Sequence, residues 1–167
     1  MLGRALTLAG GIAGAAGLSQ FPEFSQQYVQ RLGGAVDELS RFVAEFDADA
    51  DALSLSRAAA LNDLAEGSAM GAKRAETMDR VIARYERLSA DLAVLRDAGP
   101  FTRAYRMRSF ADAEIAEAAW REFRPAMPLT PAGGIFAGTG FIAGVVAIGA
   151  ILALLRAPFR RRRARAA

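Results

Sequence analysis

A run of 24 residues without a charged side chain, from Ala132 to Leu155, constrains this chain more than any other feature. As an α-helix, the run is about 36 Å long at 1.5 Å per residue, and the hydrocarbon core of a bilayer is roughly 30 Å thick. Soluble core helices rarely carry so long a charge-free stretch, so a buried helix is the weaker interpretation. Arginines cluster at 160–165, which predicts that this end is cytoplasmic, because cytoplasmic flanks are rich in Lys and Arg.

A second apolar stretch, of 18 residues, lies between Arg4 and Glu23. Its length is near the lower limit for a membrane-spanning helix. It also fits a signal peptide, with one positive charge, a short apolar core and small residues around 13–17 for cleavage. We favour an uncleaved helix because the apolar stretch ends gradually. Either interpretation leaves Arg4 in the cytoplasm and exports the middle of the chain.

Charge and composition exclude several classes of function. All 18 acidic residues lie between Glu23 and Glu122, whereas seven of the 21 basic residues lie outside residues 21–155. The high pI therefore reflects membrane flanks, and we expect no nucleic-acid binding. Histidine and cysteine are absent, which removes disulfides, thiol nucleophiles, the usual zinc ligands and the commonest general base.

The sequence predicts no catalytic, cofactor-binding or metal-binding residues, and no enzyme. Asp47, Asp49 and Asp51 alternate with alanines, which is similar to the start of a calcium-binding loop. The sixth and twelfth positions of that loop are Ala52 and Ala58 rather than glycine and glutamate. The pattern therefore favours an acidic helix end and turn.

The exported middle is predicted to be helical. Apolar residues recur at three- and four-residue steps from Phe24 to Phe46 and again from Met78 to Leu95, as in the narrow seams of coiled coils. A short helix at about 56–66, opened by Ser54 or Ser56, connects them. Gly33-Gly34 interrupts the first seam and predicts a kink or a close helix crossing. The two seams should pack as an antiparallel hairpin.

Aromatic residues and arginines alternate between 101 and 124, where Ser109 to Asp112 predicts the start of a helix that ends at Glu122. Two interpretations are open. The segment suits the headgroup interface of a membrane, or it covers one end of the hairpin. The residues concerned are Phe101, Tyr105, Phe110, Trp120 and Phe123, with Arg103, Arg106, Arg108, Arg121 and Arg124.

The predicted fold class is therefore all-α, with two transmembrane helices flanking an extramembrane, coiled-coil-like antiparallel helical hairpin. We expect an N-terminal transmembrane helix or signal anchor at 1–21 and an extracytoplasmic helical domain at 22–124. A C-terminal transmembrane helix should occupy 125–156, and a basic cytoplasmic tail 157–167. Both apolar segments carry glycines spaced four apart, which lets helices associate closely in lipid; these are Gly10, Gly14, Gly134, Gly138, Gly140 and Gly144.

The segment from Leu18 to Leu39 resembles the N-terminal signature of a family of proteobacterial membrane proteins of unknown function, domain of unknown function 2937. The resemblance implies a bacterial inner-membrane protein and supplies no activity. Polar residues of this block either form a recognition face just outside the membrane or cap and solvate a helix; they are Gln20, Glu23, Gln26, Gln27, Gln30 and Arg31.

Together these features predict a non-enzymatic component of an envelope assembly in the inner membrane. Both termini should be cytoplasmic and the central domain periplasmic. Expected partners are the bilayer and either another protein or a second copy of the chain. A homo-oligomeric channel is the alternative, although neither apolar segment contains an ionisable residue, and a membrane-bound hydrolase is weaker still. The tail arginines should contact anionic lipid headgroups; they are Arg160, Arg161, Arg162, Arg163 and Arg165.

Overall fold

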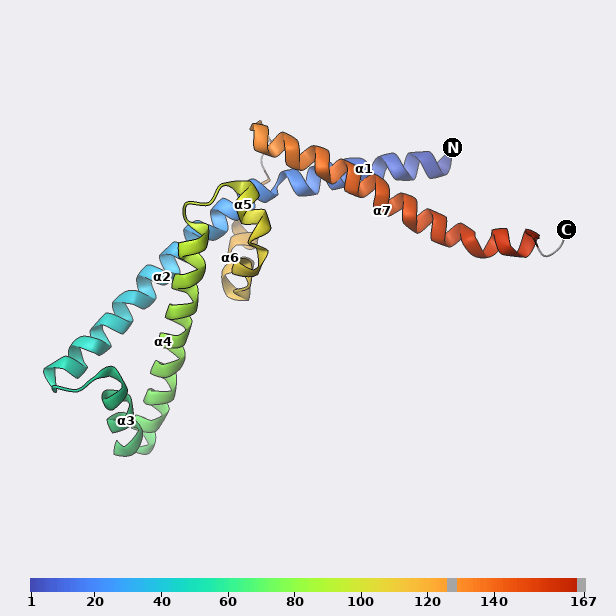
Figure 1. Ribbon diagram of the computed structural model, residues 1–167. Helices are drawn as coiled ribbons and strands as arrows, with labels where there is room; N and C mark the ends of the chain where they lie inside the picture. The colour runs from blue at the N-terminus through green and yellow to red at the C-terminus, as the bar shows by residue number, and fades with distance from the viewer. Residues whose placement is uncertain (126–128, 165–167) are drawn as a thin grey trace. The chain divides into compact units, whose positions relative to one another are not determined.

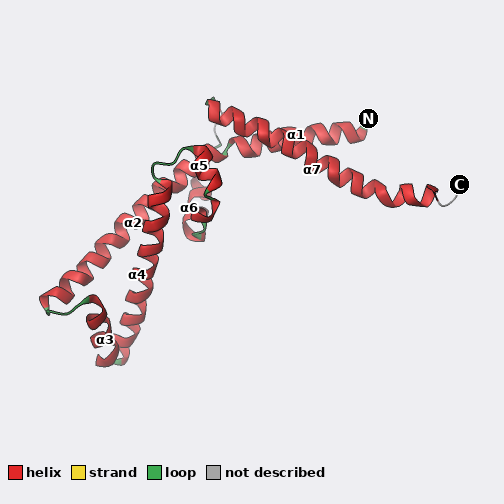
Figure 2. Ribbon diagram, in the orientation of Figure 1, coloured by secondary structure: helices red, strands yellow, loops and turns green. Residues whose placement is uncertain are grey.

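The computed structural model describes residues 1–125 and 129–164, and every regular element in those ranges is helical (Figure 2). The predicted all-α class is thereby confirmed. Helices of very different length make up the chain (Figure 1). In order they are α1 (Leu2–Ser19), α2 (Phe21–Ala52), α3 (Arg57–Gly67), α4 (Ala69–Leu95), α5 (Pro100–Tyr105), the 3-10 helix η1 (Met107–Phe110), α6 (Ala113–Glu122) and α7 (Pro131–Ala164).

The chain divides into two compact units. Unit 1 comprises residues 1–25 and 123–167 and is built around α1 and α7. Unit 2 comprises residues 26–122 and contains most of α2 together with α3 to α6. Each unit is described by itself below.

Among the described residues, only Pro131–Leu155 in α7 is long and apolar enough to cross a membrane. The sequence predicted two such helices, and α1 does not meet the same criteria. The physical reason lies in its composition. Its 18 residues include Arg4, whose charge opposes partition into lipid, and several glycines, which contribute little to it. Almost none of the α7 segment is buried within the chain.

The core of unit 2 forms where α2, α3 and α4 meet. Val43 of α2 packs with Met78 and Ile82 of α4, and partly buried neighbours from all three helices surround them, namely Phe46, Leu61, Val81 and Tyr85. Toward the other end of α4, Leu88 and Leu95 are fully buried, as are Tyr28 and Leu32 of α2. These residues occupy the seam positions of both long helices. The periodic spacing of apolar residues in the sequence therefore determines which side chains form the core.

Serine caps define the short connection between the two long helices. Ser56 accepts a hydrogen bond from the Ala59 amide at the start of α3, and Ser68 accepts one from the Gly71 amide at the start of α4. Gly71 therefore lies in the first turn of α4, where a Cβ would overlap the Leu64 carbonyl oxygen. The chain enters this connection through Ser54, which has a φ of 58°.

The glycine pair at 33 and 34 does not mark a helix crossing. α2 continues through both residues without a break, and a Cβ at either position would meet no other atom within 4 Å. The expected close contact at this point is wrong, because the glycines face open space rather than a neighbouring backbone.

An ion-pair cluster ties α3 to both long helices. Arg57, the first residue of α3, donates two hydrogen bonds to the Asp47 carboxylate, at 2.7 Å from Nε and 2.6 Å from Nη2. Its other amino group lies 3.9 Å from Glu86 of α4. The Arg57 hydrogen bonds lower the pKa of Asp47 below its ordinary value of 3.8. One of the three alternating aspartates thus serves as an anchor for α3.

The lowered Asp47 pKa predicts a pH-dependent contribution to stability. Above the ordinary pKa the carboxylate is ionised in the folded and unfolded chain, and the pair contributes fully. As the pH falls through the lower pKa of the folded state, that contribution is lost. We expect Asp47→Asn to lower the free energy of unfolding by about 0.5–1 kcal/mol at neutral pH, because the pair is partly exposed.

Thermal unfolding of both proteins between pH 3 and pH 7 tests this. The difference in midpoint between the parent and Asp47→Asn should shrink as the pH falls below 3.8. Asp97→Asn, which changes an exposed carboxylate outside the cluster, serves as the control. A difference that persists unchanged at pH 3 would contradict the ion-pair origin of the effect.

Candidate functional site

Within unit 1, α1 and α7 pack backbone against backbone. A Cβ at Gly14 would overlap the Gly140 carbonyl oxygen, and one at Gly140 would overlap the Gly14 carbonyl oxygen. Gly144 and the Gly10 carbonyl oxygen meet in the same way. A side chain at these positions would force the helices apart, so the contact requires glycine. Small residues permit the same close approach in membrane helix pairs.

The contacts also establish the direction of the two helices. Gly10 lies against Gly144 and Ile148, whereas Gly14 lies against Gly140 and Gly144. As the residue number increases along α1, the residue number of its contact on α7 decreases, so the two helices are antiparallel. The first turn of α1 consequently lies beside the C-terminal half of α7.

The structure brings four of the six predicted packing glycines together and leaves two outside the contact. Gly134 and Gly138 have no atom within 4 Å of an added Cβ. Conversely, the sequence reasoning missed Gly11, whose Cβ would lie 2.7 Å from Phe141 and 2.9 Å from Val145. Its position next to Gly10 and three residues before Gly14 was the available signal, because this spacing places all three on neighbouring faces of one helix.

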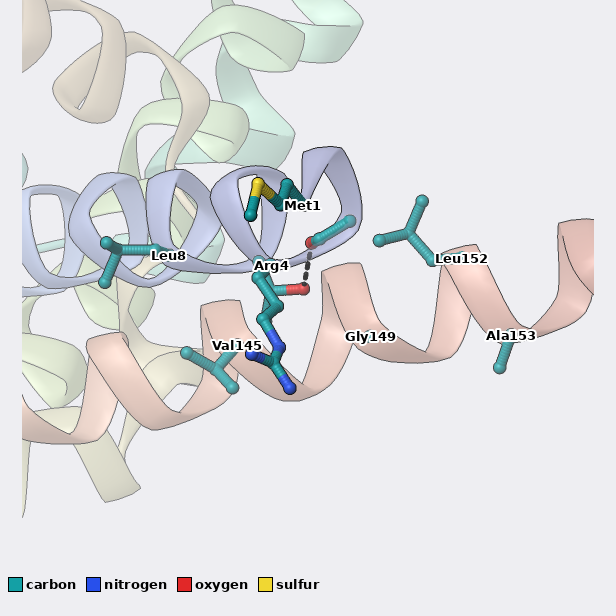
Figure 3. A pocket seen from close by; sticks show the side chains of 9 residues that line it. Met1, Arg4, Leu8, Val145, Gly149, Leu152 and Ala153 are labelled. Carbon is teal, nitrogen blue, oxygen red and sulfur yellow. Dashed lines mark hydrogen bonds between the residues drawn. The ribbon is translucent and has the colours of Figure 1, made fainter.

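A crevice opens between α1 and α7 beyond the glycine contact (Figure 3). Its volume is about 610 Å³. The walls are mostly apolar, and Figure 3 shows the Arg4 side chain extending from α1 toward α7. Arg4 makes no ion pair with a carboxylate in the described part of the chain. The lining residues are Met1, Gly3, Arg4, Thr7, Leu8, Val145, Gly149, Leu152 and Ala153.

The most buried charge of unit 2 is the carboxylate of Asp112. It lies 3.2 Å from Arg84 and 3.4 Å from Arg87 of α4, and its side chain is only 6% exposed. It also accepts a hydrogen bond from the Ile115 amide at 3.1 Å, which caps α6. Arg84 contacts Glu114 as well, at 2.5 Å. Through these contacts the Asp112 carboxylate attaches α6 to α4, which is a structural role.

Tyr28 is fully buried next to this carboxylate and stacks on Phe110 with ring centroids 4.7 Å apart. Burial raises the pKa of its hydroxyl, and the Asp112 backbone amide opposes that rise. The hydroxyl has no hydrogen-bond partner of good geometry. A phenol that is inaccessible and neutral at physiological pH is suited to packing rather than to proton transfer.

The predicted recognition residues at the start of α2 have mixed surroundings. Gln26 and Gln30 are exposed, whereas Arg31 forms an ion pair with Glu122 of α6. Gln20 donates to Ser19 at 3.0 Å, and Glu23 and Gln27 also have partners. The block thus contributes to packing as well as to the surface.

The aromatic and arginine segment is likewise divided. Phe110 packs on Tyr28, and Arg103 donates to the Leu95 and Arg96 carbonyl oxygens at 3.2 and 3.3 Å, where α4 ends. These residues cover an end of the hairpin. Tyr105 and Trp120 remain exposed.

The tail arginines lie at the end of the chain. Arg160 to Arg163 fall in the last turns of α7. Arg165 lies outside the described residues. No group of three or more acidic residues with metal-ligand geometry occurs in residues 1–125 and 129–164.

The fold and these sites define an all-helical protein with one membrane-length helix, paired through glycines with a second apolar helix. The model of a family described as a protein of unknown function (DUF2937) matches residues 2–161. The chain belongs to this family, as the resemblance of the Leu18–Leu39 block implied. Neither the curated proteins nor the solved structures yield a match.

The glycine contact predicts that a branched side chain at Gly140 separates α1 from α7. Gly140→Val should move the helix axes to the roughly 8–10 Å typical of packing through side chains. Because the chain has no cysteine, spin labels at Leu8→Cys and Leu154→Cys report the separation as an electron-spin distance. Gly138→Val is the matched control and should leave the distance unchanged. An equal shift in both variants would contradict the assigned contact.

Asp112 is predicted to hold α6 in place. Asp112→Ala removes a helix cap and leaves Arg84 without its buried partner, at a cost of about 1–3 kcal/mol. Amide hydrogen exchange of Ile115 to Ala119 should therefore accelerate about 10- to 100-fold. Glu117→Ala, which removes an exposed pair in the same helix, should have little effect. Unchanged exchange in Asp112→Ala would show that α6 is held by its apolar contacts alone.

Proposed function

We propose that this protein is an integral protein of the bacterial inner membrane and a non-enzymatic structural or interaction component of an envelope assembly. α1 and α7 cross the bilayer as an antiparallel pair, both termini are cytoplasmic, and residues 22–124 form a periplasmic arm. The observation that carries the proposal is the α1–α7 pair, two apolar helices whose backbones touch while their outer side chains remain uncovered.

The uncovered side chains favour lipid as the surroundings of unit 1. Large apolar residues are exposed along both helices, and a patch of this extent is unfavourable in water. They include Leu2, Leu6, Leu8, Ile12, Ile135, Ile142, Val146, Ile151, Leu154 and Leu155. In lipid these residues need no further cover, and the glycine contact supplies the packing that associates the helices. Pairing with α7 also supports insertion of α1, which is weakly apolar by itself.

The distribution of arginines supports cytoplasmic termini. Arg4 lines the same crevice as Leu152 and Ala153, so the basic flank of α1 and the arginines in the last turns of α7 belong to one end of the pair. Basic residues at one end of a membrane hairpin indicate its cytoplasmic side. There Arg4 and the tail would contact anionic headgroups, each charge contributing about 1 kcal/mol near the surface.

The arm supports an interaction role. Exposed apolar side chains in unit 2 include Phe42, Leu53, Met70, Tyr105 and Trp120. Large exposed side chains, aromatic ones above all, are typical of surfaces that bind other proteins.

Topology is tested with single cysteines in the natural cysteine-free chain. A membrane-impermeant maleimide added to intact spheroplasts should label Asp97→Cys in the arm, whereas Ala167→Cys in the tail should react only after permeabilisation. Labelling of each variant in permeabilised cells serves as the control for the reactivity of its cysteine. Labelling of both positions in intact spheroplasts, or of Ala167→Cys alone, would overturn the proposed orientation.

The interaction role is tested by purifying the tagged chain from its native membrane in a mild detergent. We expect a defined set of envelope proteins to co-purify in constant proportion. Recovery of a monomer without partners would overturn the assembly role. A defined oligomer of this chain alone would favour self-association and the channel alternative. Measurement of ion flux into liposomes that contain only this protein would then test the channel.

A further inference from the structure

An open groove lies where α2, α3 and α4 meet in unit 2. Its volume is about 380 Å³. A stripe along α2 and the turn that follows it lines the groove, with Phe42, Phe46, Ala50 and Leu53 at steps of three and four residues. Met78 of α4 and Leu64 of α3 add to the apolar lining.

The apolar lining extends from the core to the surface. Ala50 is buried at 3% exposure and Met78 at 7%, whereas Phe42 is 45% exposed and Leu53 is 69% exposed. Phe46 packs directly against the core cluster of Val43, Met78 and Ile82. The floor of the groove is therefore a fixed part of the core, while its margin leaves large apolar side chains uncovered.

Carboxylates surround this apolar lining. Glu45, Asp49 and Asp63 line the groove, and none of them pairs with a basic side chain in the described part of the chain. Arg74 is the basic residue in the lining. Residues 42–79 carry eight acidic and three basic residues, a net charge of −5, whereas the rest of unit 2 carries nine acidic and ten basic residues. The stretch of chain that contributes most of the groove lining thus carries the negative charge of the unit.

We propose that this groove is the docking site for a basic amphipathic helix of a partner protein. Its apolar stripe runs from Phe42 to Leu53, 11 steps along the chain, or about 16 Å and three helical turns at 1.5 Å per residue. A helix that presents apolar residues at positions i, i+3, i+4 and i+7 fits such a groove. Lysine or arginine beside those positions would meet Glu45, Asp49 and Asp63. This proposal names the surface behind the interaction role proposed above and rests on it.

The charge also distinguishes among occupants. The same groove on a second copy would bring the same three carboxylates, and like charges that face each other across an interface oppose association. A small inorganic cation would satisfy the carboxylates but leave Phe42 and Leu53 uncovered. A cationic helix with an apolar face satisfies both features of the site.

The experiment uses a spin-labelled 14-residue helical peptide of leucine and lysine with that spacing, and a counterpart with glutamate in place of lysine. Methionine methyl signals of the full chain are recorded in a nonionic detergent. The lysine peptide should broaden Met78, which lines the groove, at least twofold more than Met107 of η1, and the broadening should saturate. The glutamate peptide should leave Met78 unchanged. Equal broadening of Met78 and Met107, or no broadening, would overturn the proposal.

Variants then locate the contact. Glu45→Lys combined with Asp49→Lys should weaken binding of the lysine peptide by about tenfold or more, and Leu53→Ser should also weaken it. Asp97→Lys combined with Glu117→Lys makes the same change in net charge outside the groove and should retain binding. Equal loss in both double variants would overturn the site. The binding measurement is made in detergent and does not depend on membrane orientation. A negative result would therefore not contradict the proposed orientation, and an incorrect orientation would not contradict binding in the groove.

Discussion

Gly10, Gly14, Gly140 and Gly144 let two helix backbones approach until one added Cβ would overlap a carbonyl oxygen. In the proposed bilayer setting, unit 1 depends on this approach. Apolar side chains gain nothing there from leaving lipid for one another, so close packing must supply the attraction instead. The contact also gives α1 a partner that compensates for its arginine and its weakly apolar composition. The pairing of α1 with α7 therefore follows from a few positions that lack a side chain.

Unit 2 is stabilised by different interactions. Its long helices meet through seam residues such as Val43 and Ile82, and its shorter helices are attached by arginines. Arg57 links α3 to Asp47 and Glu86, whereas Arg84 and Arg87 of α4 hold the capping carboxylate of α6. Glu45, Asp49 and Asp63, the carboxylates of the groove, take no part in these pairs.

Local features of the sequence predicted local features of the structure well. The apolar seams, the serine cap at 54 or 56, the helix that ends at Glu122 and the spacing of the glycines all depend on residues close in the chain. The rest depends on pairing between distant segments. Gly134 and Gly138 have the same spacing as Gly140 and Gly144, yet only the latter pair faces α1, because spacing does not specify how a helix is rotated. The link from Arg84 to Asp112 crosses 28 positions, and no periodic pattern encodes it. The groove likewise depends on where the caps at Ser56 and Ser68 place α3.

The pairing of α1 with α7 joins the first and last helices of the chain, with 111 residues between them. At the usual rate of about 5–20 residues per second, the ribosome needs about 6–22 s to make that interval. During this time α1 has left the ribosome while its partner has not yet been made. In the proposed membrane orientation, a weakly apolar helix with exposed glycine backbone would have to be retained, by the insertion machinery or by a membrane chaperone, until α7 arrives. The order of the two helices would then make biogenesis of this protein sensitive to the speed of translation.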